Sequence, residues 1–307
     1  MFAPSPVRID RVLCPTDLSP LSWSALGLAL DVARSQQAEI LLVHVVAGPA
    51  HADAAGDPRV GLARLVSRAR AAGVRASGLV LHGDVVARIL ERAAAWPADL
   101  VVMGTHGQRG GHDWALGSVT ERVLRRTACP VLMTASGGAH GFAWRTPLRR
   151  ILCPSDLSEA SQRAFEYGAL LAGAFSAAIT PLHVLEWFPG RGDVPHLNVP
   201  EYHMDLSQDA RDALLRSIPG SARPFCGGEA VVALGRPHRE ILRVAVERDV
   251  DLIVLGVHDQ RALDRTLCGS TVCHVVRETC CPVLAVRGGK AAARGPAAPA
   301  ARHRRAS

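Results

Sequence analysis

The sequence contains no apolar run that approaches the roughly 18 residues of a membrane-spanning helix. Its first residues, Met-Phe-Ala-Pro-Ser-Pro-Val-Arg, lack the charged and then apolar order of a signal peptide. Hydrophobic residues make up 48% of the chain, which is normal for a soluble α/β protein. These features predict a cytoplasmic, soluble protein without a membrane partner.

Cys-x-x-Cys pairs are absent among the eight cysteines, so the commonest zinc and redox motifs are missing. Four cysteines precede a proline near expected strand ends: Cys14, Cys129, Cys153 and Cys281. We expect them to be small buried apolar residues, since cytosolic chains rarely hold structural disulfides. A metal or thiol sensor built from Cys268, Cys273 and His274 is an open alternative, although their spacing fits no common zinc pattern.

The net charge of +7 is concentrated at the C-terminus, because residues 288–307 contain five basic residues and no acidic residue. The rest of the chain is close to neutral. The tail is rich in Ala, Pro, Gly and Arg, a composition that predicts a disordered, solvated terminus. Nucleic acid is therefore not expected as a partner, apart from a weak contribution of this basic tail.

One domain occurs twice in the 307 residues. Five segments recur in the same order: 11–19 as 150–158, 40–45 as 179–184, 99–104 as 251–256, 117–120 as 269–272, and 129–132 as 281–284. Each copy alternates Val-, Ile- and Leu-rich strands with helices, as in a parallel sheet covered on both faces. We expect an α/β chain of two doubly wound parallel-sheet domains in tandem, 1–137 and 147–288, followed by the tail 289–307.

The expected elements follow the same pattern in both copies. Strands are expected near 9–14, 39–46, 76–82, 99–103 and 130–134, and again near 149–153, 177–184, 229–234, 251–255 and 282–286. Helices are expected near 20–36, 58–73, 84–95 and 117–127, with Ser19, Pro20 and Asp84 at helix starts. The stretch 186–200 predicts a long surface loop, with a lid or interface contact as the alternative.

Glycines mark the transition from a strand to a helix in the stretch 104–120. The carboxyl end of the expected strand 99–103 and the amino end of the expected helix 117–127 are joined by a stretch that contains Gly104, Gly107, Gly117 and Ser118. Backbone N–H groups and the helix dipole favour an anion at such a place, and glycine lets a phosphate approach the main chain. The stretch is not a Walker A loop, because it lacks Gly-Lys-Ser/Thr.

Other residues near these strand ends have two interpretations each. Asp17 could accept hydrogen bonds from a ribose or only cap a turn. Val45 could form an apolar wall for a base or belong to the core. The Ser118 and Thr120 hydroxyls could donate to a phosphate, and Ser118 could also cap its helix.

The motif Gly104-x2-Gly107-x9-Gly117-Ser118 resembles the ATP-binding signature of the universal stress protein family. Over residues 7–287 the chain is similar to a tandem of two UspA-like domains. The resemblance implies a Rossmann-like fold of the adenine nucleotide alpha hydrolase-like type. It implies ATP as the ligand and leaves open whether Mg²⁺ accompanies it. It also implies roles for individual residues: Asp17 at the ribose or adenine; Pro15, Thr16, Val45 and Met103 around the base; Gly104 close to the ribose; and Gly107, Gly117, Ser118, Val119 and Thr120 around the phosphates.

The second copy departs from this signature at Asp259, which stands where the second phosphate glycine belongs. Its carboxylate would repel a phosphate, because two like unit charges 4 Å apart repel by about 4 kcal/mol at a dielectric constant near 20. Four other motif residues are retained: Asp156, Gly256, Gly269 and Ser270. The hypothesis is that the first domain binds ATP, and that the second binds weakly, binds AMP-like ligands or is structural.

The motif predicts a nucleotide-responsive stress or regulatory protein, and at most a slow ATPase. The loop offers His106, Arg109, His112 and Asp113, but no compact carboxylate pair for Mg²⁺. The alternative is a non-catalytic dimerisation or interaction scaffold in which the nucleotide is incidental. The family resemblance also implies strand pairing across a two-fold axis, through 131–134 and 283–286, in a homodimer or an internal pseudo-dimer.

Overall fold

The computed structural model describes residues 7–19, 22–47, 57–105, 116–134, 147–186, 200–257 and 270–288. The first half contains β1 (Arg11–Pro15), α1 (Ser22–Gln36), β2 (Glu39–Val46), α2 (Pro58–Ala71), β3 (Arg75–His82), α3 (Val85–Ala95), β4 (Leu100–Met103), α4 (Ser118–Arg126) and β5 (Val131–Met133). The second contains β6 (Arg150–Ser155), α5 (Glu159–Phe175), β7 (Ala178–Glu186), α6 (Pro200–Ser217), β8 (Val231–Gly235), α7 (Pro237–Glu247), β9 (Leu252–Val257), α8 (Ser270–Glu278) and β10 (Val283–Arg287).

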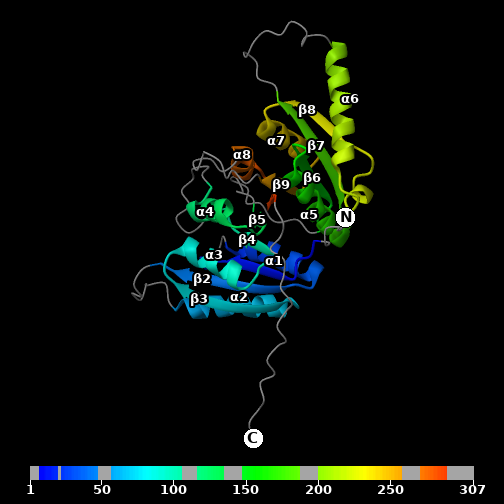
Figure 1. Cartoon of the computed structure of the whole chain (residues 1–307). Coiled ribbons are helices and arrows are strands. Elements are labelled where there is room, and N and C mark those ends of the chain that lie inside the picture. Colours follow the sequence, from blue (N-terminus) through cyan, green and yellow to red (C-terminus); the bar gives the residue numbers. More distant parts are fainter. Residues whose placement is uncertain are drawn as a thin grey trace.

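The strands form one ten-stranded sheet in the order β3-β2-β1-β4-β5-β10-β9-β6-β7-β8 (Figure 1). Pairing within each half is parallel, and each half is doubly wound, with its first strand at the centre. Buried side chains of α1, α2, α5 and α6 form the core on one face, and those of α3, α4, α7 and α8 form the core on the other. The α/β fold class with two doubly wound domains in tandem is therefore confirmed.

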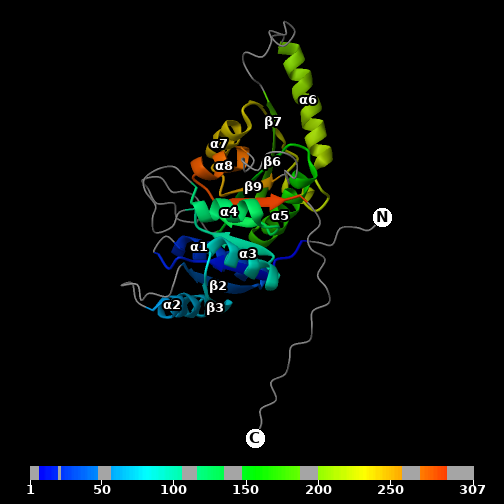
Figure 2. The ribbon, with the colours of Figure 1, turned by 60° about the vertical axis from the view of Figure 1, so that its left-hand side comes forward.

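An antiparallel pair joins the two halves inside one chain. Leu132 of β5 lies opposite Leu284 of β10, and Met133 lies opposite Val283. From β10 the Arg287 guanidinium donates to the Leu124 and Arg125 carbonyls at the end of α4, at 2.8 and 2.5 Å. Figure 2 shows α4 beside β10. The strands proposed for a two-fold contact thus pair internally, so each covers the edge that the other would expose.

An aspartate carboxylate fixes the start of the first strand in each half by the same pair of hydrogen bonds. The Asp99 carboxylate accepts hydrogen bonds from the Asp10 and Arg11 amides, both at 2.9 Å. In the second half, Asp251 accepts from the Arg149 and Arg150 amides at the same distance. The duplicated sequence therefore produces duplicated contacts as well as duplicated elements.

Element bounds agree with the sequence expectations to within about two residues, with one informative exception. Pro200 begins α6 instead of ending a loop, because proline suits the first turn of a helix. The preceding stretch 187–199, with its proposed lid role, lies outside the described residues, as do Pro20 and the linker 135–146. Asp84 caps α3 as expected, since its side chain accepts from the Ala87 amide at 2.8 Å.

Candidate functional site

Asp17 stabilises the turn between β1 and α1. Its Oδ1 accepts from the Ser19 amide at 3.0 Å, from the Ser19 hydroxyl at 2.6 Å and from the Ser22 hydroxyl. Leu18 has a φ of 62°, and its amide donates to the Thr16 hydroxyl at 3.1 Å. The capping interpretation of Asp17 is therefore realised. A carboxylate offers two oxygens and about four acceptor positions, so this capping is compatible with a ribose contact.

The second half repeats this turn. Asp156 Oδ1 accepts from the Ser158 amide at 3.1 Å and from the Ser161 hydroxyl. Leu157 has a φ of 66°, and its amide donates to the Ser155 hydroxyl at 3.1 Å. The aspartate is thus explained in both halves by folding of the turn alone. Its presence at these positions does not distinguish a nucleotide-binding half from a structural one.

A histidine from the neighbouring strand secures each turn. In the first half, His44 Nδ1 of β2 donates to the Thr16 carbonyl at 2.9 Å. In the second, His183 Nδ1 of β7 donates to the Ser155 carbonyl at 2.7 Å. A carbonyl oxygen can only accept, so the proton lies on Nδ1. Both histidines stand at the same place in the repeated strand 40–45 and 179–184, but no motif in the sequence points to this role.

The residues proposed to line a base pocket come together at one edge of the sheet. Pro15 ends β1 and Thr16 follows it, Val45 lies near the end of β2, and Met103 ends β4. β1 lies between β2 and β4, so the chain reverses its winding direction at β1. Ligands of doubly wound sheets bind at such a switch point. Val45 is half-buried against the core, so both interpretations of this residue stay open.

Two hydrogen bonds join the residues on either side of the glycine loop, and we call this pair of contacts the neck of the loop. The Gly117 amide donates to the Thr105 carbonyl at 2.8 Å, and the Thr120 hydroxyl donates to the Gly104 carbonyl at 2.8 Å. Gly107 lies outside the described residues. The first turn of α4 is therefore held directly beside the end of β4.

The amino end of α4 lacks a side-chain cap. Gly117 occupies the cap position with no side-chain hydrogen bond, and Ser118 is the exposed first residue of the helix. The capping interpretation of Ser118 is therefore wrong. The amides of Ser118, Val119 and Thr120 have no partner within the helix, because first-turn amides lie beyond the reach of the helical ladder. Such amides and the helix dipole favour an anion.

The corresponding region of the second half is closely packed at Gly256. A Cβ at Gly256 would lie 2.6 Å from the Ala160 carbonyl carbon and from the Ser161 amide nitrogen. Gly256 is therefore required by the close approach of the first turn of α5. Val272 takes the place of Thr120 and is buried. Because valine has no hydroxyl, it cannot make the hydrogen bond that Thr120 makes. Gly269 and Asp259 lie outside the described residues.

Burial suppresses the reactivity of the cysteines at strand ends. It raises the pKa of Cys14 and of Cys281 to about 12, and it also raises the pKa of Cys153 and Cys129. Thiols of this kind are inert at neutral pH, because the thiolate is the reactive form. Cys273 is buried too, and the part of the chain that the structure describes holds no group of three metal-ligating side chains. Cys268 lies outside it.

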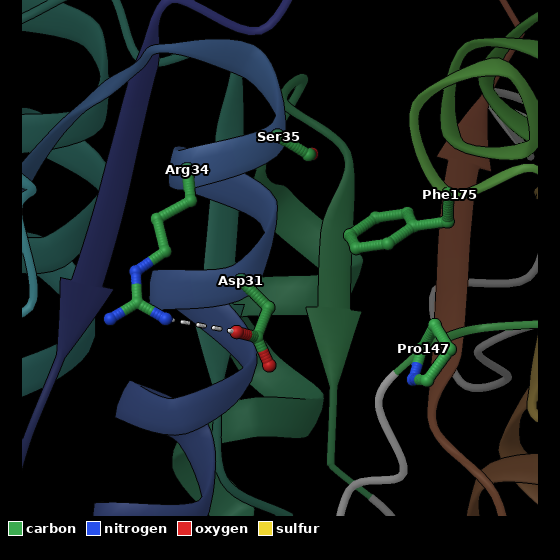
Figure 3. A pocket seen from close by; sticks show the side chains of 5 residues that line it. All are labelled: Asp31, Arg34, Ser35, Pro147 and Phe175. Carbon is green, nitrogen blue, oxygen red and sulfur yellow. Dashed lines mark ion pairs between the residues drawn. The ribbon is translucent and has the colours of Figure 1, made fainter.

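A separate open pocket of about 470 Å³ lies between the ends of α1 and α5 (Figure 3), and five residues line it: Asp31, Arg34, Ser35, Pro147 and Phe175. Asp31 and Arg34 form an ion pair at 3.8 Å within it. A helix rises 1.5 Å per residue, which places the α1 residues of this pocket roughly 14–20 Å along the helix from Ser22. The pocket is therefore not part of the strand-end site.

The fold and the candidate site define a tandem α/β protein whose candidate ligand site lies at the carboxyl ends of its central strands. The model of the universal stress protein family matches residues 8–135 and 147–287. The chain therefore belongs to the universal stress protein family.

Relatives match one half or both. A universal stress protein of Methanocaldococcus jannaschii is 32% identical over 139 residues, covering 40% of this chain and 80% of that protein. One from Mycobacterium tuberculosis H37Rv is 27% identical over 290 residues, covering 92% of this chain and 86% of that protein. The crystal structure of a universal stress protein from Archaeoglobus fulgidus has a TM-score of 0.62 at 22% identity, covering 92% of this chain and 98% of that one, and shows the same fold. None of the helices described here is long and apolar enough to cross a membrane.

Proposed function

We propose that the first half of the chain binds ATP at the carboxyl ends of β1, β2 and β4, and that the protein is a nucleotide-responsive stress or regulatory protein. The observation that carries this proposal is the amino end of α4. Its cap position is Gly117, which supplies no side-chain hydrogen bond, and its first turn is held beside the end of β4. A phosphate at this place would satisfy first-turn amides that lack helical partners.

The other residues at this edge complete a nucleotide site. Pro15, Thr16, Val45 and Met103 would surround the base, and Asp17 would accept hydrogen bonds from the ribose. Gly104 would lie close to the ribose, and Gly107 together with the amides at 117–120 would surround the phosphates. The Thr120 hydroxyl would act indirectly, because it donates to the Gly104 carbonyl and so positions the strand end.

Nucleotide binding and the loop would be coupled through the neck. The Gly117 amide and the Thr105 carbonyl close the loop at 2.8 Å. A ligand on the amides after Gly117 would bear directly on this contact, so bound and free states would differ in the loop that a partner protein could contact. Catalysis is not required for such a response, and any ATP hydrolysis would be slow.

The second half would bind weakly, bind AMP-like ligands or be structural. In the sequence, Asp259 replaces the second phosphate glycine with an acidic residue, and Val272 replaces Thr120 and so lacks its hydroxyl. Gly256 lies close to the backbone of the first turn of α5, which explains this glycine without a ligand. The presence of Asp156 in this half is explained without a ligand, since its side chain stabilises its own turn.

The test is nucleotide binding by matched variants. Asn keeps the acceptor oxygen that caps the turn but removes the charge, so Asp17→Asn and Asp156→Asn make the same change in the two halves. We expect one ATP per chain by calorimetry, with and without Mg²⁺, and about tenfold weaker binding only for Asp17→Asn. Equal losses in both variants would overturn the assignment to the first half.

A non-catalytic interaction scaffold is the second candidate, and the internal β5–β10 pair favours it, because one chain already forms the complete two-fold unit. The two functions separate in a simple experiment. The purified protein is denatured, and released nucleotide is identified by chromatography. No adenine nucleotide, together with no thermal shift on addition of ATP, would favour the scaffold.

A further inference from the structure

The outer face of α2 is positively charged. The helix contains Arg59, Arg64, Arg68 and Arg70 and no acidic residue. Arg64 and Arg68 are exposed and stand one helical turn apart. Within the described ranges, neither forms an ion pair. The face therefore presents two exposed arginine side chains to its surroundings.

On two other helices of the chain, an exposed arginine pairs with an acidic residue of the same helix. Arg88 of α3 pairs with Glu91 at 2.8 Å, and Arg243 of α7 pairs with Glu247 at 2.7 Å. Such pairs between residues three or four positions apart are the usual arrangement on a helix surface. Among the α-helices that the structure describes, α2 alone contains no acidic residue with which its arginines could pair.

Exposed apolar groups flank the two arginines. Val60 lies one turn before Arg64 and is 52% exposed, and Trp23 of α1 is 46% exposed. The Arg68 guanidinium lies 4.7 Å from the centre of the Trp23 ring. A cation in this position is held over the ring face, so the Arg68 side chain and the indole form one ordered surface. Tryptophan and arginine are the residue types most enriched among the energetic centres of protein interfaces.

We propose that Val60, Arg64, Arg68 and Trp23, here called the α2 basic face, bind an acidic helical segment of a partner protein. Carboxylates four residues apart on a helix have the same spacing as Arg64 and Arg68, so they can pair one to one. Val60 and Trp23 would cover the apolar side of the segment. The chain's own terminus is not a suitable occupant, because residues 289–307 contain basic residues and no acidic residue.

Nucleic acid fits this face less well. Its affinity for a protein grows with the number of phosphates neutralised, and the face spans only about 12 Å from Val60 to Arg68. Two large exposed apolar side chains in so short a span are typical of a protein interface. Because the face lies on α2 and the first turn of α1, its function does not require a bound nucleotide, and ligand-free protein is suitable for the test.

The probe is a fluorescein-labelled peptide of about 18 residues, long enough to form a helix, built from Ala, Leu and Glu with Glu at every fourth position. Its control is the same peptide with Gln in place of Glu. Binding is measured by fluorescence anisotropy at low ionic strength, where charge pairing is least screened. We expect the Glu peptide to bind and the Gln peptide to bind at least about tenfold more weakly.

Two double variants locate the binding site. Arg64→Gln with Arg68→Gln removes the charges of the α2 basic face, and Gln has nearly the same helix propensity as Arg. Arg211→Gln with Arg216→Gln makes the same charge change at exposed positions of α6, at the opposite end of the molecule (Figures 1 and 2). We expect about tenfold weaker peptide binding only for the first variant.

Several outcomes would overturn the proposal. They are no binding of the Glu peptide, equal binding of the two peptides, and equal losses in the two double variants. A single-stranded oligonucleotide serves as a competing probe. If it binds more tightly than the Glu peptide and loses affinity on Arg64→Gln with Arg68→Gln, the face is a nucleic-acid site and the protein partner is excluded.

Discussion

The Thr120 hydroxyl donates a hydrogen bond to the Gly104 carbonyl at 2.8 Å and so joins the first turn of α4 to the end of β4. In the second half the same two places are held by Val272 and Gly256, and a valine cannot make this bond. The two halves therefore share a fold and a β1–α1 type of turn, but they differ in how the strand end meets the helix that would face a phosphate.

Replacing Thr120 with valine should make the first half resemble the second at this contact. The variant leaves the Gly104 carbonyl without its hydroxyl donor, so we expect a loss of about 1–3 kcal/mol in the free energy of unfolding, measured by urea denaturation. ATP binding should weaken as well, because the strand end is no longer positioned. Ser118→Ala is the control, since its hydroxyl is exposed and its loss should change stability by less than about 0.5 kcal/mol. A fully stable Thr120→Val protein would contradict this account.

Gly256→Ala should destabilise the second half. The added Cβ would lie 2.6 Å from backbone atoms of Ala160 and Ser161, and backbone cannot move aside as a flexible side chain can. Overpacking of this kind costs about 1–3 kcal/mol or more. The matched control is Gly27→Ala in α1, where nothing lies within 4 Å of the new atom.

In that control, alanine should raise stability by about 0.5–1 kcal/mol, because glycine is a poor helix former. Chemical denaturation of both variants measures the difference. Similar stability of the two variants would show that α5 does not approach Gly256 as closely as the structure indicates.

Arg287→Gln should weaken the connection between the halves. The guanidinium of this residue donates to the Leu124 and Arg125 carbonyls at the end of α4, where a cation also complements the helix dipole. We expect a loss of about 1.5–3 kcal/mol in the free energy of unfolding. Arg126→Gln, at an exposed position of the same helix, should change little. Equal effects of the two substitutions would exclude a specific role for the Arg287 contact.

A stacked histidine pair predicts a pH dependence of stability in the second half. His238 of α7 stacks on His274 of α8, with ring centres 4.6 Å apart. Burial and the neighbouring His274 lower the pKa of His238 below 6.5; Arg239 and Arg236 act in the same direction, and Glu278 opposes them. The unfolded chain therefore takes up the proton first as pH falls. Stability is fully present above about 6.5 and decreases below it.

His238→Gln removes this protonation, so the melting temperature of the variant should fall less than that of the parent between about pH 7.5 and pH 5.5. Differential scanning fluorimetry measures both. His82→Gln, at the exposed end of β3, is the matched control and should behave like the parent. An identical fall in parent and His238→Gln protein would remove the pair as the cause.

Much of the fold could be predicted from sequence because the signals were local and occurred twice. Strand and helix positions follow from apolar patterning, and the aspartate turns after β1 and β6 follow from Pro-[Thr/Ser]-Asp-Leu-Ser. The β5–β10 pair was predicted from the family resemblance, and the structure contains it. The roles of His44 and His183 were missed, because a hydrogen bond from one strand to the next turn leaves no spacing pattern along the chain.

The sequence by itself determined the duplication, the alternation of strands and helices, and the two groups of glycines, since each depends on neighbouring residues. Only the tertiary structure decided which atoms those residues contact. It directed the Thr120 hydroxyl to Gly104, assigned the α4 cap to Gly117 instead of Ser118, and placed the first turn of α5 against Gly256. Contacts of this kind depend on how distant elements pack against one another, and their distances are set by the summed volumes of many side chains.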